Sequence, residues 1–143
     1  MKEAIVSKGP KVNIIDSPIP TPEADQVVTK VVVSGSNPKD WKRPEWSGAS
    51  LNSGDDIAGV VHAVGSNVVE FKPGDRVAAF HQIMAPAGSF AEYAVSWAHT
   101  TFHIPKKTSF EGQYLTARST QQLDHFSESY SLLWCVQRLQ QSL

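Results

Sequence analysis

The 143-residue sequence contains a single cysteine, Cys135, which excludes an internal disulfide and any zinc lobe built from four cysteines. No apolar stretch approaches the length of a membrane span, and the start of the chain lacks the long apolar run of a secretory signal. No basic run is longer than two residues and the net charge is -1, which disfavours nucleic acid or an anionic membrane as a partner. We therefore expect a soluble, cytoplasmic protein.

Proline and glycine are missing from the last part of the chain. All nine prolines lie at or before Pro105, and all nine glycines at or before Gly112, whereas six of the eight glutamines follow. A change of composition this abrupt usually marks a boundary. Because the length suits one ordinary domain, we predict a domain over residues 1–111 and a divergent tail over residues 112–143.

Short β-rich runs separated by Gly/Pro turns fill the first part. Glu3–Ser7 and Lys11–Asp16 flank Gly9-Pro10, which predicts a hairpin. A glycine inside the fourth run, Gly59, predicts a bulge or a sharp bend. The spacing of the runs predicts a mainly β fold, a small antiparallel barrel or sandwich. The remaining strands are predicted over Gln26–Ser34, Asp56–Val64, Arg76–Phe80, Ser89–Val95 and Thr100–Ile104.

The tail has a different pattern. Thr108–Glu111 fits a helix capping box, with Thr as N-cap and Glu three residues later. Apolar residues then recur every three or four positions, which predicts an amphipathic helix that docks on the barrel, with a dimer-forming helix as the alternative. These apolar residues are Leu123, Phe126, Tyr130, Leu133, Val136, Leu139 and Leu143.

Six stretches in the first part, taken in their order and spacing, resemble the N-terminal GroES-like domain of the medium-chain dehydrogenase/reductase family. The resemblance covers residues 1–111, and it extends most closely to zinc-free quinone reductases and fungal trans-acting enoyl reductases. It implies a GroES-like small antiparallel barrel for these residues. The stretches are Ser36–Lys42, Gly54–Val61, Ala63–Val68, Phe71–Val77, Gly88–Tyr93 and Ile104–Glu111.

The same resemblance implies an activity. Its members are NAD(P)H-dependent oxidoreductases, so we expect hydride transfer to a carbonyl-conjugated double bond, as in an enoyl reductase, or to a quinone. The substrate would be a small molecule or an enoyl group on a carrier, with a polyketide synthase as a candidate partner in fungal secondary metabolism. The cofactor would supply the hydride, while the protein supplies position and electrostatics.

The zinc ligands of the zinc-dependent members are changed here. Their cysteine lies near the position of Asn37, and their Gly-His-Glu motif matches Gly54-Asp55-Asp56. An amide is a poor replacement for a thiolate, and an Asn/Asp/Asp set suits harder cations than zinc. We therefore predict no catalytic zinc. His62 and His81 each lie alone in an apolar stretch, which favours a hydrogen-bonded barrel residue over a metal ligand.

The Asn-Pro-X-Asp turn supplies the candidate site residues. By resemblance, Asn37 would hydrogen-bond the cofactor or a substrate carbonyl, and Asp40 would orient the turn. Lys39 or Lys42 would face a phosphate or the acidic carrier of the substrate. The catalytic candidates are thus Asn37 and Asp40, and the cofactor-binding candidates are Asn37, Lys39 and Lys42. The residues themselves leave an alternative open, because Asn-Pro is a common turn start and Asp40 can simply cap a short helix.

No Gly-X-Gly-X-X-Gly fingerprint for a dinucleotide occurs in the sequence. Family members continue with a Rossmann domain after the position of Glu111, whereas this chain continues with a Gln/Ser-rich tail. We therefore expect an N-terminal fragment without the Rossmann domain, which does not bind NADPH by itself. A non-catalytic barrel is the alternative function, and the residues choose neither between NADPH and NADH nor between an enoyl and a quinone substrate.

Overall fold

The computed structural model describes residues 1–9 and 11–110 of the chain. Over these residues the fold is mainly β and antiparallel, which confirms the predicted fold class. No helix of the described residues is long and apolar enough to cross a membrane. The elements are, in order, β1 (Lys2–Ser7), β2 (Lys11–Asp16), β3 (Gln26–Gly35), α1 (Pro38–Ser47), β4 (Asp56–Val64), β5 (Arg76–Phe80), β6 (Tyr93–Trp97), the 3-10 turn η1 (Ala98–Thr100) and β7 (Thr101–His103).

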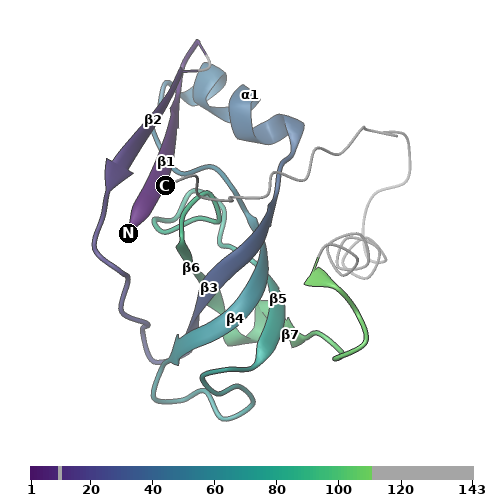
Figure 1. The fold of residues 1–143 in the computed structure, drawn as a ribbon. Coiled ribbons are helices and arrows are strands. Elements are labelled where there is room, and N and C mark those ends of the chain that lie inside the picture. The colour runs from purple at the N-terminus through teal and green to yellow at the C-terminus, as the bar shows by residue number, and fades with distance from the viewer. Residues whose placement is uncertain (10, 111–143) are drawn as a thin grey trace.

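The five later strands form one curled antiparallel sheet in the order β6-β3-β4-β5-β7 (Figure 1). Strands β1 and β2 form a separate hairpin, as predicted, with Lys2 paired to Asp16 and Ser7 paired to Lys11. The hairpin and α1 lie together beyond one end of the large sheet, and α1 contacts β1 there. The chain therefore passes from β3 through α1 back to β4 at the same end of the sheet.

Gly59 is required by the close approach of β3 to β4. A Cβ atom at this position would lie 2.1 Å from the carbonyl oxygen of Lys30, on the neighbouring strand. The β3–β4 register shifts between Val31, which pairs with Gly59, and Val33, which pairs with Ala58. The irregularity expected near Gly59 is therefore present, but the extra residue is Val32 on β3, opposite the glycine, and not a residue of β4.

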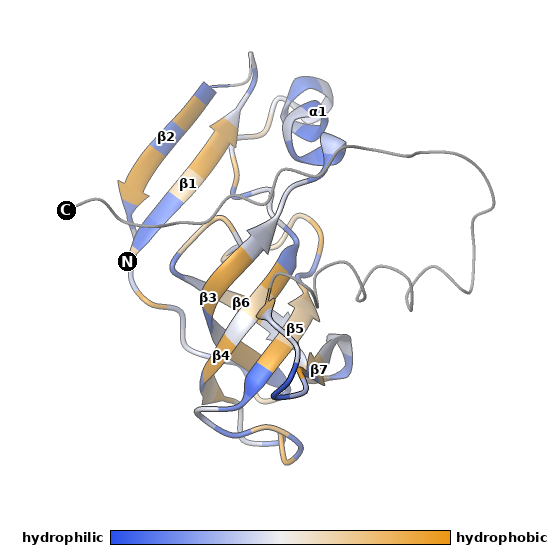
Figure 2. Ribbon diagram, turned by 45° about the vertical axis from the view of Figure 1, so that its right-hand side comes forward, coloured by the Kyte–Doolittle hydropathy of each residue, from blue (hydrophilic) through white to orange (hydrophobic). Residues whose placement is uncertain are grey.

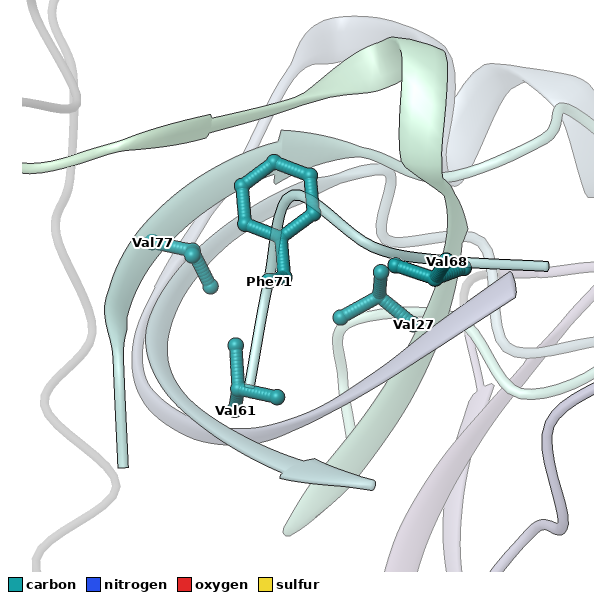
Figure 3. Packing of buried hydrophobic residues seen from close by; sticks show 5 residues of the cluster. All are labelled: Val27, Val61, Val68, Phe71 and Val77. Atoms are coloured by element: carbon teal, nitrogen blue, oxygen red, sulfur yellow. The ribbon is translucent and has the colours of Figure 1, made fainter. Parts of the chain in front are cut away.

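Valine side chains dominate the inside of the sheet. The largest cluster of buried side chains draws on β3, β4, β5 and the connection between β4 and β5 (Figure 3). In Figure 2 the strands of the sheet are largely orange, whereas α1 is mostly blue or pale. The apolar cluster, as we call it below, consists of Val27, Val61, Val68, Phe71 and Val77.

Two predicted strands need correction. The strand expected over Ser89–Val95 begins only at Tyr93, because the backbone N–H of Ser89 donates to the carbonyl of Gly54 instead of joining a ladder. Ala91 makes only an isolated bridge to Glu3. The strand expected over Thr100–Ile104 is shortened to Thr101–His103, and the turn η1 precedes it.

The predicted tail lies outside the described residues. This applies to the helix expected over residues 112–143, to its apolar positions, and to Glu111, the last member of the predicted capping box.

Candidate functional site

Helix α1 begins where the candidate turn predicts a helix start. Asn37 precedes the helix in an extended conformation, and Pro38 occupies its first turn, where a missing N–H costs nothing. The carboxylate Oδ2 of Asp40 accepts a hydrogen bond from the backbone N–H of Asn37 at 2.7 Å. The helix ends at Gly48, which has φ 69° and donates its N–H to the carbonyl of Pro44. Asp40 therefore caps α1, as the alternative interpretation allowed.

Two cations on α1 face the sheet. Lys39 and Arg43 are four residues apart, so they lie on the same face of the helix. The ammonium Nζ of Lys39 lies 2.7 Å from Asp40 Oδ1 and 2.5 Å from Asp55 Oδ2. Arg43 Nη2 lies 3.6 Å from the same oxygen of Asp55. These ion pairs tie the helix to the residue that precedes β4.

Asp55 and His81 are brought together by the pairing of β4 with β5. Asp56 pairs with Phe80 at the end of this ladder, and the backbone N–H of His81 donates to the carbonyl of Asp55 at 2.7 Å, just beyond it. The side chains meet as well, with His81 Nδ1 3.2 Å from Asp55 Oδ1. Both residues are 1% exposed. We call the five residues Lys39, Asp40, Arg43, Asp55 and His81 the charge cluster.

Burial raises the pKa of both carboxyl groups in the charge cluster, but the net pKa shifts of the two groups have opposite directions. It raises the pKa of Asp40 above its ordinary value, and the hydrogen bond and charge of Lys39 only partly oppose this. Burial also acts on Asp55, but hydrogen bonds from His81 and Lys39, with the positive charges of Lys39 and Arg43, outweigh it and lower the pKa of Asp55. Asp55 is therefore the ionised anchor of the cluster.

The structure brings three of the four candidate residues together. Asn37, Lys39 and Asp40 lie at the start of α1, and the amide Nδ2 of Asn37 donates to Asp56 Oδ2 at 2.5 Å. The ammonium group of Lys39 is already paired with two carboxylates, so a phosphate would have to compete with them for it. Lys42 is exposed and makes no hydrogen bond or ion pair within residues 1–9 and 11–110.

Comparison with known proteins places this arrangement in a family. Residues 23–106, more than half of the chain, match the alcohol dehydrogenase GroES-like domain. The chain belongs to this family, within the medium-chain dehydrogenases/reductases. The resemblance stated from the motifs is thereby confirmed.

Relatives of this GroES-like chain include oxidoreductases of two kinds. It is 60% identical over 113 residues to "Trans-enoyl reductase fsr4" of Gibberella fujikuroi, covering 78% of this chain and 33% of that protein. It is 38% identical over 101 residues to the human "Quinone oxidoreductase", covering 67% of this chain and 30% of that protein. The chain thus spans about a third of the length of these relatives.

Solved structures show the same fold. A quinone oxidoreductase from Coxiella burnetii superposes with a TM-score of 0.69 at 25% identity, over 77% of this chain and 38% of that one. A dehydrogenase from Escherichia coli, solved with NADH, superposes with a TM-score of 0.71 at 25% identity, over 80% of this chain and 41% of that one.

The donor groups of this GroES-like domain do not fit a zinc ion. Asp55, which the motif resemblance matches to the histidine of zinc-dependent members, has one carboxylate oxygen on Lys39 and Arg43 and the other on His81. Asn37 directs its amide nitrogen, not a ligating atom, toward Asp56. A metal cation here would have to displace side-chain cations that already balance the carboxylates, and residues 1–9 and 11–110 include no cysteine whose thiolate could compensate.

Sequence reasoning missed Arg43 and gave His81 only a general structural role. The four-residue spacing of Lys39 and Arg43 on a helix was a usable signal for the first. His81 lies 26 residues from Asp55, and only the β4–β5 register brings the two together.

Proposed function

We propose that this chain forms the substrate-side wall of a zinc-free, NAD(P)H-dependent reductase of the enoyl reductase type. The observation that supports it most is the 60% identity to a trans-enoyl reductase across 113 residues. A quinone is the second candidate substrate, supported by the 38% identity to the human quinone oxidoreductase. We place the protein in the cytoplasm, with a polyketide synthase as candidate partner.

The chemistry requires two things of this wall. As hydride reaches the β-carbon of a conjugated alkene, negative charge develops on the carbonyl oxygen, and donors must face it. A proton must then reach the α-carbon. The nicotinamide cofactor supplies the hydride when it is bound.

The residues of this chain that would act in the reaction lie at the start of α1 and on that helix. The side-chain amide of Asn37 stands at the start of the helix, and the charge cluster fixes the helix against β4 and β5. A donor held in this way needs little reorganisation during the reaction. Exposed Lys42 can meet a phosphate of the cofactor or of the substrate carrier. Asp40 acts as a positioning residue through its bond to the backbone of Asn37.

The described residues contain no glycine-rich turn between a strand and a helix, so they offer no dinucleotide cradle of the Rossmann kind. The wall that holds the nicotinamide must therefore come from residues other than these. In the alternative, the barrel has no partner wall that holds the nicotinamide, and it is not catalytic.

A chimera tests the proposal. Residues 1–111 would replace the corresponding third of the Gibberella trans-enoyl reductase, and NADPH oxidation would be followed with an enoyl thioester and with a quinone. We expect reduction of the thioester, and we expect Asn37→Ala to lower kcat by about 10²-fold, the scale for one lost oxyanion donor. Lys42→Met, on the same helix, should raise KM and leave kcat almost unchanged.

Controls separate the alternatives. The 143-residue chain alone should show no NADPH binding by calorimetry. Micromolar binding would contradict the proposal that the wall that holds the nicotinamide comes from other residues. A chimera that binds NADPH but reduces neither substrate, while the parent enzyme does, would favour the non-catalytic barrel. Turnover of the quinone alone would select the second candidate.

A further inference from the structure

Strand β2 lies at the outer edge of the β1–β2 hairpin (Figure 1). All of its residues, Lys11–Asp16, are exposed. Three of them are large and apolar, since Val12 is 58%, Ile14 65% and Ile15 41% exposed. Figure 2 accordingly shows β2 largely in orange. A short strand of this kind, without proline, glycine or net charge, has the composition of segments that pair with further strands.

The backbone of β2 is paired with β1 on one side. Ala4 and Val6 of β1 donate their backbone N–H groups away from β2, to carbonyl groups outside the hairpin. In an antiparallel ladder, successive residues of a strand direct their N–H and C=O groups to opposite sides. The alternate residues of β1 therefore form the hydrogen-bonded pairs with β2. Their partners in β2 are Lys11, Asn13 and Ile15.

The other side of β2 is an open edge. Val12, Ile14 and Asp16 direct their N–H and C=O groups to this side, where no strand from residues 1–9 and 11–110 pairs with them. Because side chains alternate between the two faces of a strand, Val12 and Ile14 also share one face of the hairpin. The edge therefore offers a further strand both free backbone groups and two β-branched side chains.

We propose that β2 pairs antiparallel with β2 of a second copy of this chain, about a two-fold axis at Asn13. The two hairpins then form one continuous sheet, in which Val12 of each copy lies opposite Ile14 of the other. Each such pair exchanges both of its backbone hydrogen bonds. This association is independent of the proposed reductase activity.

The charges of β2 favour a second copy as the partner and set its direction. Lys11 is the first residue of the strand and Asp16 is the last. In an antiparallel pair the lysine end of one copy lies near the aspartate end of the other, whereas a parallel pair would bring like charges together. Since each strand carries both charges, two copies of β2 complement each other in an isologous interface.

The side chains select the register. Only residues with outward N–H and C=O groups form hydrogen-bonded pairs, so Val12 must lie opposite an even-numbered residue of the other copy. The register centred on Asn13 places Val12 and Ile14 of both copies together on one face, as β-branched cross-strand pairs. It also places the two Asn13 amides opposite each other on the other face, where one can donate to the other. A shift by two residues would instead place Val12 opposite the carboxylate of Asp16.

Sedimentation equilibrium of the 143-residue chain tests the association. Two paired strands bury less area than the roughly 1,600 Å² of a standard interface, so we expect a reversible monomer–dimer equilibrium with a dissociation constant in the micromolar range or weaker. A chain that stays monomeric up to about 1 mM would overturn the proposal. Assemblies larger than a dimer would also overturn it, because two-fold pairing occupies the open edge of both strands.

Amide exchange on the wild-type chain tests the edge itself, so that no variant has to fold. The N–H groups of Val12 and Ile14 should become more protected as the concentration, and with it the fraction of dimer, rises. Those of Asn13 and Ile15 already bond to β1 and should keep their protection factors. An equal rise at all four amides would overturn strand pairing. Protection of Val12 and Ile14 in the monomer would show that another segment of the same chain covers the edge, and it would overturn the second copy as the partner.

Contacts between copies test the register. In a mixture of ¹³C-labelled and unlabelled chains, a filtered nuclear Overhauser spectrum reports only contacts between copies. We expect a contact between the two Asn13 Hα atoms, because a non-hydrogen-bonded pair brings its Cα atoms to about 4.5 Å. A contact from Asn13 to Ile15 of the other copy would overturn the register.

Two matched variants complete the test. Ile14→Lys places a charge in the apolar face that the two copies share, so it should raise the dissociation constant of the dimer by at least about tenfold. Val69→Lys removes an exposed valine outside β2 and should leave the dissociation constant unchanged. Both side chains are exposed, so both variants should fold as the wild type does. Equal weakening by the two variants would show association through exposed apolar side chains in general, and it would overturn the pairing of β2.

Discussion

The apolar cluster and the charge cluster are both buried, yet they are held by different forces. The apolar cluster consists of four valines and Phe71, all at most 8% exposed, and packing without preferred direction holds it (Figure 3). Asp40, Asp55 and His81 are buried just as deeply, but each needs a partner at a particular atom. The first cluster should lose stability in proportion to the volume removed. The second should fail when one charge is left unpaired.

Phe71→Ala should have the largest effect. The phenyl ring packs against Val27, Val61 and Val77, and removing it leaves a cavity in the middle of the cluster. We expect the free energy of unfolding to fall by about 4 kcal/mol, as for other buried phenylalanines, with little dependence on pH. Urea unfolding measures this. Val69→Ala is the matched control, because Val69 is 88% exposed and should change stability by less than about 0.5 kcal/mol. A loss at Phe71 as small as that at Val69 would contradict the packing described here.

Asp55→Asn should cause the second-largest loss in the free energy of unfolding, and this loss should depend on pH. The substitution keeps the shape of the side chain but leaves Lys39, Arg43 and His81 without their common anion. We expect a loss of about 3 kcal/mol at neutral pH, the scale for a buried pair that loses one partner. Since the pKa of Asp55 is lowered in the folded state, its contribution is present above the ordinary value of 3.8 and is lost as the pH falls below it.

The pH dependence distinguishes this effect from a simple packing defect. Unfolding of wild type and Asp55→Asn should be compared at neutral pH and below pH 3.8, where the difference should shrink. Asp40, whose pKa is raised, affects the pH dependence of stability in the opposite direction. Its burial is unfavourable when it is ionised, and protonation on acidification relieves this cost. Both proteins share this contribution. Asp16→Asn, at an exposed ion pair with Lys2, is the control and should change little at either pH. An equal loss at both pH values for Asp55→Asn would contradict the electrostatic explanation.

The sequence predicted the apolar side of this comparison better than the charged side. Short β-rich runs bounded by Gly/Pro turns located β4 and β5 at their observed bounds, because each such signal is local. The prediction failed at Ser89, where the backbone bonds to Gly54, far away in the sequence. Local propensity could not reveal that partner.

In the candidate site, too, the sequence predicted the contacts between near neighbours and missed those between distant residues. The bond between Asp40 and the backbone of Asn37 spans three residues, and the turn motif was sufficient to suggest it. The contact between Asp55 and His81 spans 26 residues and depends on the register of β4 and β5. Whether Asn37 and Lys42 contact a cofactor or a substrate stays a prediction.

Thr29→Val should have the smallest effect on the free energy of unfolding, and it should raise this free energy where the other substitutions lower it. Thr29 is fully buried in β3, and its hydroxyl has no hydrogen-bond partner in the part of the chain that the structure describes. A buried hydroxyl without a partner is unfavourable, and valine has nearly the same shape, so the free energy of unfolding should rise by about 1 kcal/mol. Thr101→Val is the matched control, since the hydroxyl of Thr101 donates to the carbonyl of Trp97 at 2.8 Å and pairs with Ser96. That variant should lose about 1 kcal/mol. If urea unfolding shows that Thr29→Val loses stability as Thr101→Val does, the hydroxyl of Thr29 has a hydrogen-bond partner after all, and the interior of the sheet is less purely apolar than the comparison requires.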